Sequence, residues 1–316
     1  MAANSENGGA QQESFPVFSF SNQNSLGFGL FGSSPSSSAS PAKNITPPPP
    51  PPPCIEVLFS EMSSSVKSTM ESIDFDFDDE AVTLHKGRVS TQEVFKLSNS
   101  DLVPGKYEGG LKLWEGSLDL VKALHSEIHG GKLSLNGKRV LELGCGHGLP
   151  GIYTWLKGAS EVHFQDFNAE VLRCLTIPNV NANSKEPETD THRGVRFFAG
   201  DWSEIHQLLN HVSDHSEEKS LDSRSELDAG YDVILMAETV YCIDSLQNLY
   251  ELIKKCLKRP NGVVYMAGKK HYFGVGGGTR HFLSVVENDG VMAASLTAEV
   301  TDGSSNVREV WKLSFK

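Results

Sequence analysis

A row of alternating glycines carries the clearest chemical signal in this sequence. Gly144, Gly146 and Gly148 stand at every second position behind Glu142, at the end of the apolar segment 139–143. Glycine has no Cβ, so its backbone can approach a ligand closely and can adopt positive φ angles. In an open α/β sheet, ligands bind at the carboxyl ends of the strands. The spacing therefore predicts a ligand site formed mainly by backbone at a strand end.

Two classes of ligand fit this loop. Gly146-x-Gly148-x-x-Gly151 matches the GxGxxG fingerprint of dinucleotide sites, with Asp166 as the ribose carboxylate. Counted from Glu142, the same loop matches the acidic-x-Gly-x-Gly-x-Gly pattern of S-adenosylmethionine enzymes. Glu142 favours the second class, because its carboxylate would meet the amine of a cationic ligand and would repel a pyrophosphate. A glycine-rich turn without a ligand is the least favoured alternative, since Asp166 follows at the next strand end.

A polar set follows a second apolar segment. Glu238, Thr239 and Tyr241 come after segment 231–236, which is apolar beyond Asp232 and is typical of a strand buried on both faces. Parallel strands end at the same edge of a sheet, so we expect this set near the glycine loop, where it would handle a substrate.

Alternating strand and helix patterns surround these positions. The expected strands are 139–143, 162–165, 195–198, 231–236 and 262–267, with helical segments up to Leu156 and over 168–183, 245–257 and 279–288. Two last runs, 293–300 and 307–315, flank the turn signal Asp302-Gly303. This order predicts an α/β fold, a Rossmann-like doubly wound parallel sheet with an antiparallel C-terminal hairpin.

Composition divides the chain into a tail and one domain. Residues 1–53 hold 10 of the 15 prolines and three charged side chains, and they end in seven consecutive prolines. Such a segment buries too little apolar surface to offset its ordering entropy. Segment 54–73 has some helical spacing, and 74–80 alternates acids with phenylalanine, as in a solvated linker or an interaction tail. We therefore expect a disordered tail over 1–90 and one domain over 91–316.

Charge and cysteine usage exclude several classes of protein. The net charge is −12, and the polar segment 208–230 is expected to be a solvated insertion. Without a basic surface, direct nucleic-acid binding is not expected, and a basic protein partner is favoured. The five cysteines show neither paired nor metal-ligand spacing, so we expect reduced thiols and no metal centre. The absence of a secretion signal and of an apolar run long enough to span a bilayer predicts a soluble intracellular protein.

From about residue 101 onward, the sequence resembles the histidine protein methyltransferases, the family of the yeast protein that methylates a histidine of ribosomal protein uL3. The matching stretches are DLVPGKYEGGLKLWEGS (101–117), VLELGCGHGLPG (140–151), VHFQDFN (162–168), IPNVNAN (177–183), FFAGDW (197–202), YDVILMAETVY (231–241) and KKHYFGVGGG (269–278). The last stretch is the most specific. Glu142 departs from the aspartate of many relatives by one methylene. The resemblance implies a seven-stranded methyltransferase sheet with S-adenosylmethionine as cofactor.

The resemblance and the glycine loop together imply a set of cofactor-binding residues. These are Leu113, Trp114, Glu115, Gly116, Ser117, Glu142, Gly144, Gly146, Gln165, Asp166, Phe167, Gly200, Asp201, Trp202 and Ala237. Asp166 can accept hydrogen bonds from both ribose hydroxyls. Asp201 can bind the adenine amino group, and Trp202 can stack on the adenine, with a plain core role as the alternative for Trp202.

The implied reaction transfers a methyl group from a sulfonium to a histidine ring. A neutral imidazole has an unshared pair near pH 7, because its ordinary pKa is about 6.5. The protein must then fix the tautomer with an acceptor at the other ring nitrogen. Glu238 is the first candidate, and Tyr241 and His271 are secondary, although His271 could instead have a packing role. Gly274 and 276–278 are expected to form a flexible loop near the substrate.

The expected function is therefore a protein-histidine N-methyltransferase acting on a basic, uL3-like ribosomal protein. We expect a monomer, and family analogy suggests the cytoplasm and nucleus. Two alternatives stay open. One is a protein-lysine methyltransferase of the same superfamily, and the other is a non-catalytic cofactor-binding protein whose tail recruits partners.

Overall fold

The computed structural model describes residues 50–316, apart from 65, 67, 99, 185–193, 212–229, 302, 304 and 305. The described residues all belong to one compact unit, Pro47–Lys316. The predicted disorder up to residue 49 and most of the predicted insertion at 208–230 lie outside the described residues. Among the helices of the described part, none combines the length and apolar character needed to cross a bilayer.

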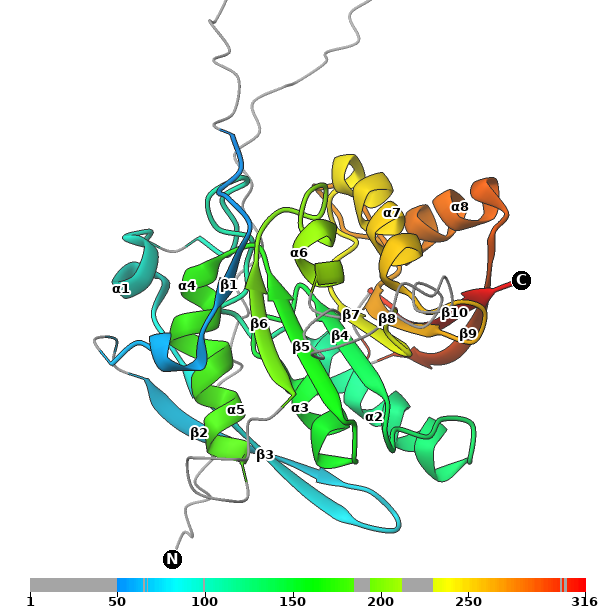
Figure 1. The fold of residues 1–316 in the computed structure, drawn as a ribbon, viewed down its shortest axis with the longest axis horizontal. Helices are drawn as coiled ribbons and strands as arrows, with labels where there is room; N and C mark the ends of the chain where they lie inside the picture. The colour runs from blue at the N-terminus through cyan, green and yellow to red at the C-terminus, as the bar shows by residue number, and fades with distance from the viewer. Residues whose placement is uncertain are drawn as a thin grey trace, which may run out of the picture. The chain divides into compact units, whose positions relative to one another are not determined.

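A largely parallel sheet forms the centre of the molecule (Figure 1). Its strand order is β1-β6-β5-β4-β7-β8-β10-β9. The strands are β1 (Ile55–Val57), β4 (Arg139–Leu143), β5 (Glu161–Asp166), β6 (Val195–Ala199), β7 (Val233–Ala237), β8 (Val263–Lys269), β9 (Met292–Val300) and β10 (Arg308–Phe315). Strands β4 to β8 are parallel, whereas β10 runs antiparallel between β8 and β9. The predicted doubly wound sheet with an antiparallel C-terminal hairpin is confirmed.

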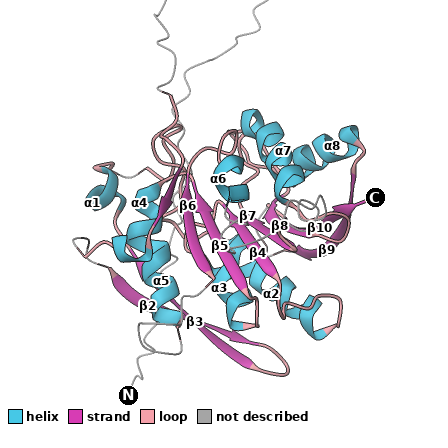
Figure 2. Ribbon diagram, in the orientation of Figure 1, coloured by secondary structure: helices cyan, strands magenta, loops and turns pink. Residues whose placement is uncertain are grey.

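Helices cover both faces of this sheet (Figure 2). The helices of the described residues are α1 (Thr91–Phe95), α2 (Glu115–His129), α3 (Leu149–Leu156), α4 (Ala169–Val171), α5 (Ile177–Asn183), α6 (His206–His211), α7 (Leu246–Cys256) and α8 (Thr279–Asp289), of which α1 packs in a separate small cluster with Tyr107. A π-helical turn, Leu172–Thr176, joins α4 to α5. One core lies against α2, α3 and α5, and the other lies against α6, α7 and α8.

Neighbouring residues of each central strand contribute to opposite cores. Val140 belongs to the first core and Leu141 to the second, and the same alternation holds for Val233 and Ile234. Successive side chains of a strand point to opposite faces, so a strand covered on both faces must be apolar at nearly every position. This is why the central strands could be predicted from short apolar runs.

The predicted domain boundary at residue 90 is wrong. β1 pairs antiparallel with β6 and adds an eighth strand to the expected seven. β2 (Thr69–Asp76) and β3 (Ala81–Arg88) form a separate two-stranded hairpin, which packs on α5 and α3. The alternation of acids and phenylalanines that suggested a tail instead follows the two-residue repeat of a β-strand, in which successive side chains point to opposite faces. Phe75 is buried in the first core, and its acidic neighbours face outward.

Helix α2 is a second element that the sequence patterns did not predict. It precedes the first parallel strand and packs on β8 and α3. Its buried residues include Asp119, His125 and Glu127. These charged and polar side chains interrupt the apolar face, which is why the pattern was not recognised as a core helix.

Candidate active site

The glycine loop lies where the sequence placed it, between the end of β4 and the start of α3. Gly144, Gly146 and Gly148 have φ angles of 60°, 49° and 70°. A Cβ on Gly144 would lie 2.7 Å from Thr239 Cγ2, and one on Gly146 would lie 2.9 Å from the Gly110 carbonyl oxygen. The glycines are therefore needed both for the backbone conformation and for close packing against two other segments.

Gln165 ties three strand ends together beside this loop. Its side-chain oxygen accepts hydrogen bonds from the Gly144 N–H at 3.3 Å and from Trp202 Nε1 at 2.9 Å. Its amide nitrogen donates to the Gly200 carbonyl at 2.9 Å. Gln165 is fully buried and Trp202 is half-buried next to Gly144. The ends of β4, β5 and β6 thus form one surface, with the indole ring at its border.

Asp166 holds the loop in shape through backbone donors. One carboxylate oxygen accepts the Gly146 N–H and the other accepts the Asn168 N–H, both at 3.0 Å. Burial raises the pKa of Asp166 to about 6, and these hydrogen bonds oppose that rise. Binding of the ribose hydroxyls by the remaining acceptor positions of this carboxylate stays a prediction.

Glu142 lies behind the loop rather than in its open side. The side chain is 1% exposed, and its carboxyl accepts the Gly151 N–H at 2.8 Å near the start of α3. Burial raises its pKa to about 8, and the Gly151 hydrogen bond opposes that rise. Selection of a cationic ligand by a Glu142 charge stays a prediction. A contact between Glu142 and the cofactor stays a prediction.

Glu238 is held in an unusual conformation directly after β7. Its φ is 57°, a left-handed value that a glutamate rarely adopts. One carboxyl oxygen accepts the Gly116 N–H at 3.2 Å, and the other accepts the hydroxyl of Tyr272. Burial raises the pKa of Glu238, and the Tyr272 hydrogen bond and the Lys269 charge oppose that rise. A strained backbone that aims a buried acid is typical of a functional site.

Three residues of this region were not predicted as site residues. Tyr272 donates to Glu238, and Glu108 accepts the hydroxyl of Tyr241. The Tyr241 and Tyr272 rings meet edge to face, with centroids 6.5 Å apart. Lys269 lies 5.9 Å from the Trp114 ring centre. All three belong to segments that showed the family resemblance, but only the tertiary structure shows that they surround Glu238 and Tyr241.

His271 is separate from this network, since its side chain is exposed. The glycines that follow it are required for packing. A Cβ on Gly277 would collide with the Tyr241 carbonyl, and the Gly277 N–H donates to that carbonyl at 3.0 Å. The Gly278 N–H donates to the Val240 carbonyl at 2.8 Å. Gly277 and Gly278 are therefore explained by their close contact with the backbone that follows β7. The predicted flexibility of this loop stays a prediction.

The other predicted cofactor residues lie on segments next to these. Trp114 precedes α2 and donates from Nε1 to the Gly109 carbonyl at 3.1 Å. Glu115 is exposed and lies 3.6 Å from Arg308, whereas Gly116 contacts Glu238. Asp201 accepts hydrogen bonds from both the backbone and the hydroxyl of Ser203. The remaining positions are half-buried: Leu113, Ser117, Phe167 and Ala237.

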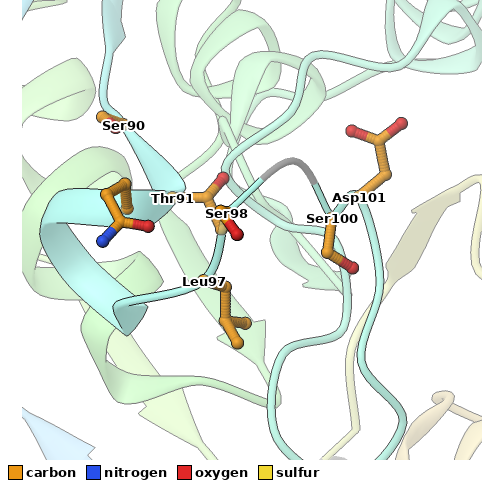
Figure 3. Close-up of a pocket in the computed structure, with 7 residues that line it drawn as sticks. Ser90, Thr91, Leu97, Ser98, Ser100 and Asp101 are labelled. Atoms are coloured by element: carbon orange, nitrogen blue, oxygen red, sulfur yellow. The ribbon is translucent and has the colours of Figure 1, made fainter.

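A surface hollow of about 570 Å³ lies beside α1 and is shown in Figure 3. Its walls include Ser90, Thr91, Leu97, Ser98 and Asp101. None of the predicted site residues lines it, so it is distinct from the network around the glycine loop.

Comparison with known proteins assigns the family. A family model described as lysine methyltransferase matches residues 104–288. The chain belongs to this methyltransferase family. A protein of Dictyostelium discoideum named histidine protein methyltransferase 1 homolog is 43% identical over 70% of this chain and 62% of its own length. Its Bos taurus namesake is 40% identical over 65% and 55%, and the Saccharomyces cerevisiae histidine protein methyltransferase 1 is 29% identical over 60% and 60%. The chain thus spans about 60% of the length of these relatives.

As a methyltransferase of this family, the chain has S-adenosylmethionine as its cofactor, and the strand ends fit such a ligand. The Thr239 hydroxyl is buried beside Gly144 and has no hydrogen-bond partner among the described residues. A buried hydroxyl without a partner is costly, and a ligand polar group would satisfy it. Gly144, Gln165 and Trp202 line the same place. The individual contacts of these residues with the cofactor stay predictions.

Proposed function

We propose that this chain transfers a methyl group from S-adenosylmethionine to a ring nitrogen of a histidine in a protein. The observation that carries the proposal is the Glu238 carboxyl, which is fixed by Gly116 and Tyr272 directly after β7. The adjacent residue, Thr239, packs on the glycine loop. The names of the curated relatives support the same reaction.

The chemistry requires orientation of the substrate more than activation. S-adenosylmethionine supplies a methyl group that is already activated on a sulfonium. A neutral imidazole needs one ring nitrogen free of a proton, so an acceptor must hold the N–H of the other nitrogen. Glu238 is suited to this role because the Gly116 N–H and the Tyr272 hydroxyl donate hydrogen bonds to its carboxyl and hold it in place. Such positioning is the main way in which an enzyme accelerates a displacement between bound groups.

Glu238 also provides a place for the proton. A ring nitrogen that accepted the methyl group from S-adenosylmethionine would make the imidazole cationic, with the cofactor's sulfur keeping the electron pair. The remaining N–H proton of the ring could then pass to the Glu238 carboxylate. Burial raises the pKa of Glu238, which makes the carboxylate a better proton acceptor than an exposed glutamate.

The proposed substrate is a basic ribosomal protein of the uL3 type. The chain's net charge of −12 favours a basic partner over free nucleic acid. Phe273 is 71% exposed and Ile243 is 52% exposed, and both lie on segments adjoining Tyr241 and Tyr272. Such apolar side chains beside the network are suited to contacting a protein surface. We also propose that the chain acts as a monomer in the cytoplasm and nucleus.

The decisive experiment methylates ribosomal proteins from cells that lack this protein. The purified chain and methyl-labelled S-adenosylmethionine are added, and the modified residue is identified by mass spectrometry. Label in a histidine of uL3, lost with Glu238→Gln and kept with the exposed control Glu299→Gln, is the expected result. Full methylation of uL3 in the cells that lack the protein would refute the proposal that uL3 is the substrate.

Methylation of lysine is the second candidate, favoured by the description of the matching family model. Label in lysine and none in histidine would establish it. Cofactor binding measured by calorimetry without transfer to any ribosomal fraction would instead indicate a non-catalytic binding protein.

A further inference from the structure

A cluster of metal-ligand side chains lies away from the glycine loop, where the β2–β3 hairpin meets helix α2. His125 and His129 stand one helical turn apart on α2, and Asp79 belongs to the turn of the hairpin. Residues at i and i+4 of a helix lie on one face, so both imidazoles are directed to the same place. We propose that Asp79, His125 and His129 bind a divalent transition metal, with Zn²⁺ as the best match.

The distances within the cluster suit a small ion. His125 Nε2 lies 2.9 Å from one Asp79 oxygen, and His129 Nδ1 contacts the other. One ligand atom from each of the three residues lies within 4.8 Å of the other two. Zinc binds nitrogen and oxygen at about 2.0–2.1 Å, so two of its tetrahedral ligands are roughly 3.4 Å apart. Small movements of the side chains would close the cluster around the ion.

The surroundings of His125 hold its ring in the orientation that a ligand needs. The His125 side chain is 8% exposed, and Nδ1 lies 3.0 Å from the buried Tyr153 hydroxyl. When Nδ1–H donates to that hydroxyl, Nε2 carries the free electron pair and faces Asp79. Metal-binding histidines commonly use their second nitrogen in this way. The Phe77 ring stacks on the imidazole at 3.5 Å and fixes its plane.

The local charge favours a cation. A surface hollow of about 760 Å³ at this place is lined by Asp74, Asp76 and Asp78 as well as by the three ligands. Lys122 is the basic side chain in its lining. Glu80 lies at the opposite nitrogen of each imidazole, 3.4 Å from His125 Nδ1, and pairs with Lys157, so water is the expected fourth ligand.

Two imidazole nitrogens and one carboxylate oxygen select the class of metal. Mg²⁺ and Ca²⁺ prefer oxygen ligands, whereas imidazole suits zinc and its neighbours in the periodic table. A bound ion would cross-link the hairpin to α2, the helix whose Gly116 N–H holds Glu238. The metal would therefore stabilise the fold. Because the cluster lies away from the glycine loop, we assign the metal no part in the methyl transfer.

The test titrates the chelator-treated full chain with Zn²⁺ in competition with a chromophoric chelator. We expect one equivalent to bind, binding to weaken at least tenfold in His129→Gln and in Asp79→Asn, and no change in the control His281→Gln, an exposed histidine on α8. Zinc should raise the thermal unfolding temperature of the wild type and not that of His129→Gln.

Co²⁺ distinguishes this cluster from the five cysteines. The expected absorption has the d–d bands of nitrogen and oxygen ligands and lacks a thiolate charge-transfer band. A thiolate band, absence of stoichiometric binding, or equal zinc affinity in the wild type and His129→Gln would each overturn the proposal.

Discussion

Replacing Tyr272 by phenylalanine tests the role proposed for Glu238. The substitution removes the hydroxyl that donates to the buried carboxyl and leaves the Gly116 N–H as the other donor. A hydrogen bond to a charged group contributes about 1.5–3 kcal/mol. Loss of that contribution in the transition state corresponds to a roughly 10- to 160-fold fall in kcat/KM near neutral pH.

The sign of the accompanying pH effect follows from the same contact. Burial raises the pKa of Glu238, and the Tyr272 hydrogen bond lowers it. Without that bond the pKa rises further, and less carboxylate is present at neutral pH. The acidic limb of the kcat/KM profile should therefore move to higher pH, and part of the lost activity should return as pH rises.

The assay is steady-state methylation of a histidine-containing substrate between pH 6 and 9. Tyr250→Phe is the matched control, because the Tyr250 hydroxyl donates to Asp289 at 2.9 Å on the α7–α8 side of the sheet. The control should keep the rate and the pH profile of the wild type. A Tyr272→Phe profile that is lowered equally at every pH, or not lowered at all, would refute the reasoning.

Three further predictions concern the cofactor site and the stability of the fold. Gly144→Ala, with its Cβ 2.7 Å from Thr239 Cγ2 and a φ of 60°, should weaken S-adenosylmethionine binding at least tenfold in calorimetry; unchanged affinity would show that the cofactor binds elsewhere. Asp119→Ala leaves the buried Arg308 guanidinium without its 2.6 Å partner and should lower the free energy of unfolding in urea by about 3–5 kcal/mol, whereas a loss below 1 kcal/mol would contradict a buried ion pair. Burial lowers the pKa of His163 to about 3, so below about pH 6.5 the unfolded chain binds a proton that the folded chain does not bind. The free energy of unfolding should therefore decline, through this group, by up to about 1.4 kcal/mol for each unit by which the pH falls. The His163→Gln variant should show a smaller slope. An equal slope in the variant would show that other groups cause the acid sensitivity.

The order of strands and the position of the ligand loop could be predicted because they depend on local patterns. Short apolar runs mark strands that are buried on both faces, and the glycine spacing marks a backbone that must take positive φ angles. The hairpin at residues 69–88 was missed because its local pattern is ambiguous. Its acidic residues face solvent on one side of the strands, and the same alternation is found in an unfolded acidic segment.

The site was predictable as a set of segments but not as a set of contacts. Glu238 was expected at the end of a strand, and the structure adds its partners Gly116 and Tyr272, which are 122 and 34 residues away in sequence. The direction of the Glu142 side chain was also beyond the sequence. An acid beside a glycine loop suggests a charge that faces the ligand, whereas the folded chain buries Glu142 and its carboxyl accepts the Gly151 N–H near the start of α3.

The sequence alone determined the fold class, the family resemblance and the edge of the sheet at which a ligand would bind, because each depends on residue types at fixed spacing. The tertiary structure decided which polar groups meet. Hydrogen bonds such as Tyr272 to Glu238 and Tyr241 to Glu108, and the meeting of Asp79 with His125 and His129, join segments far apart in the chain. Burial then raises the pKa of Glu238, because desolvation acts on a carboxyl group only after the chain has folded around it.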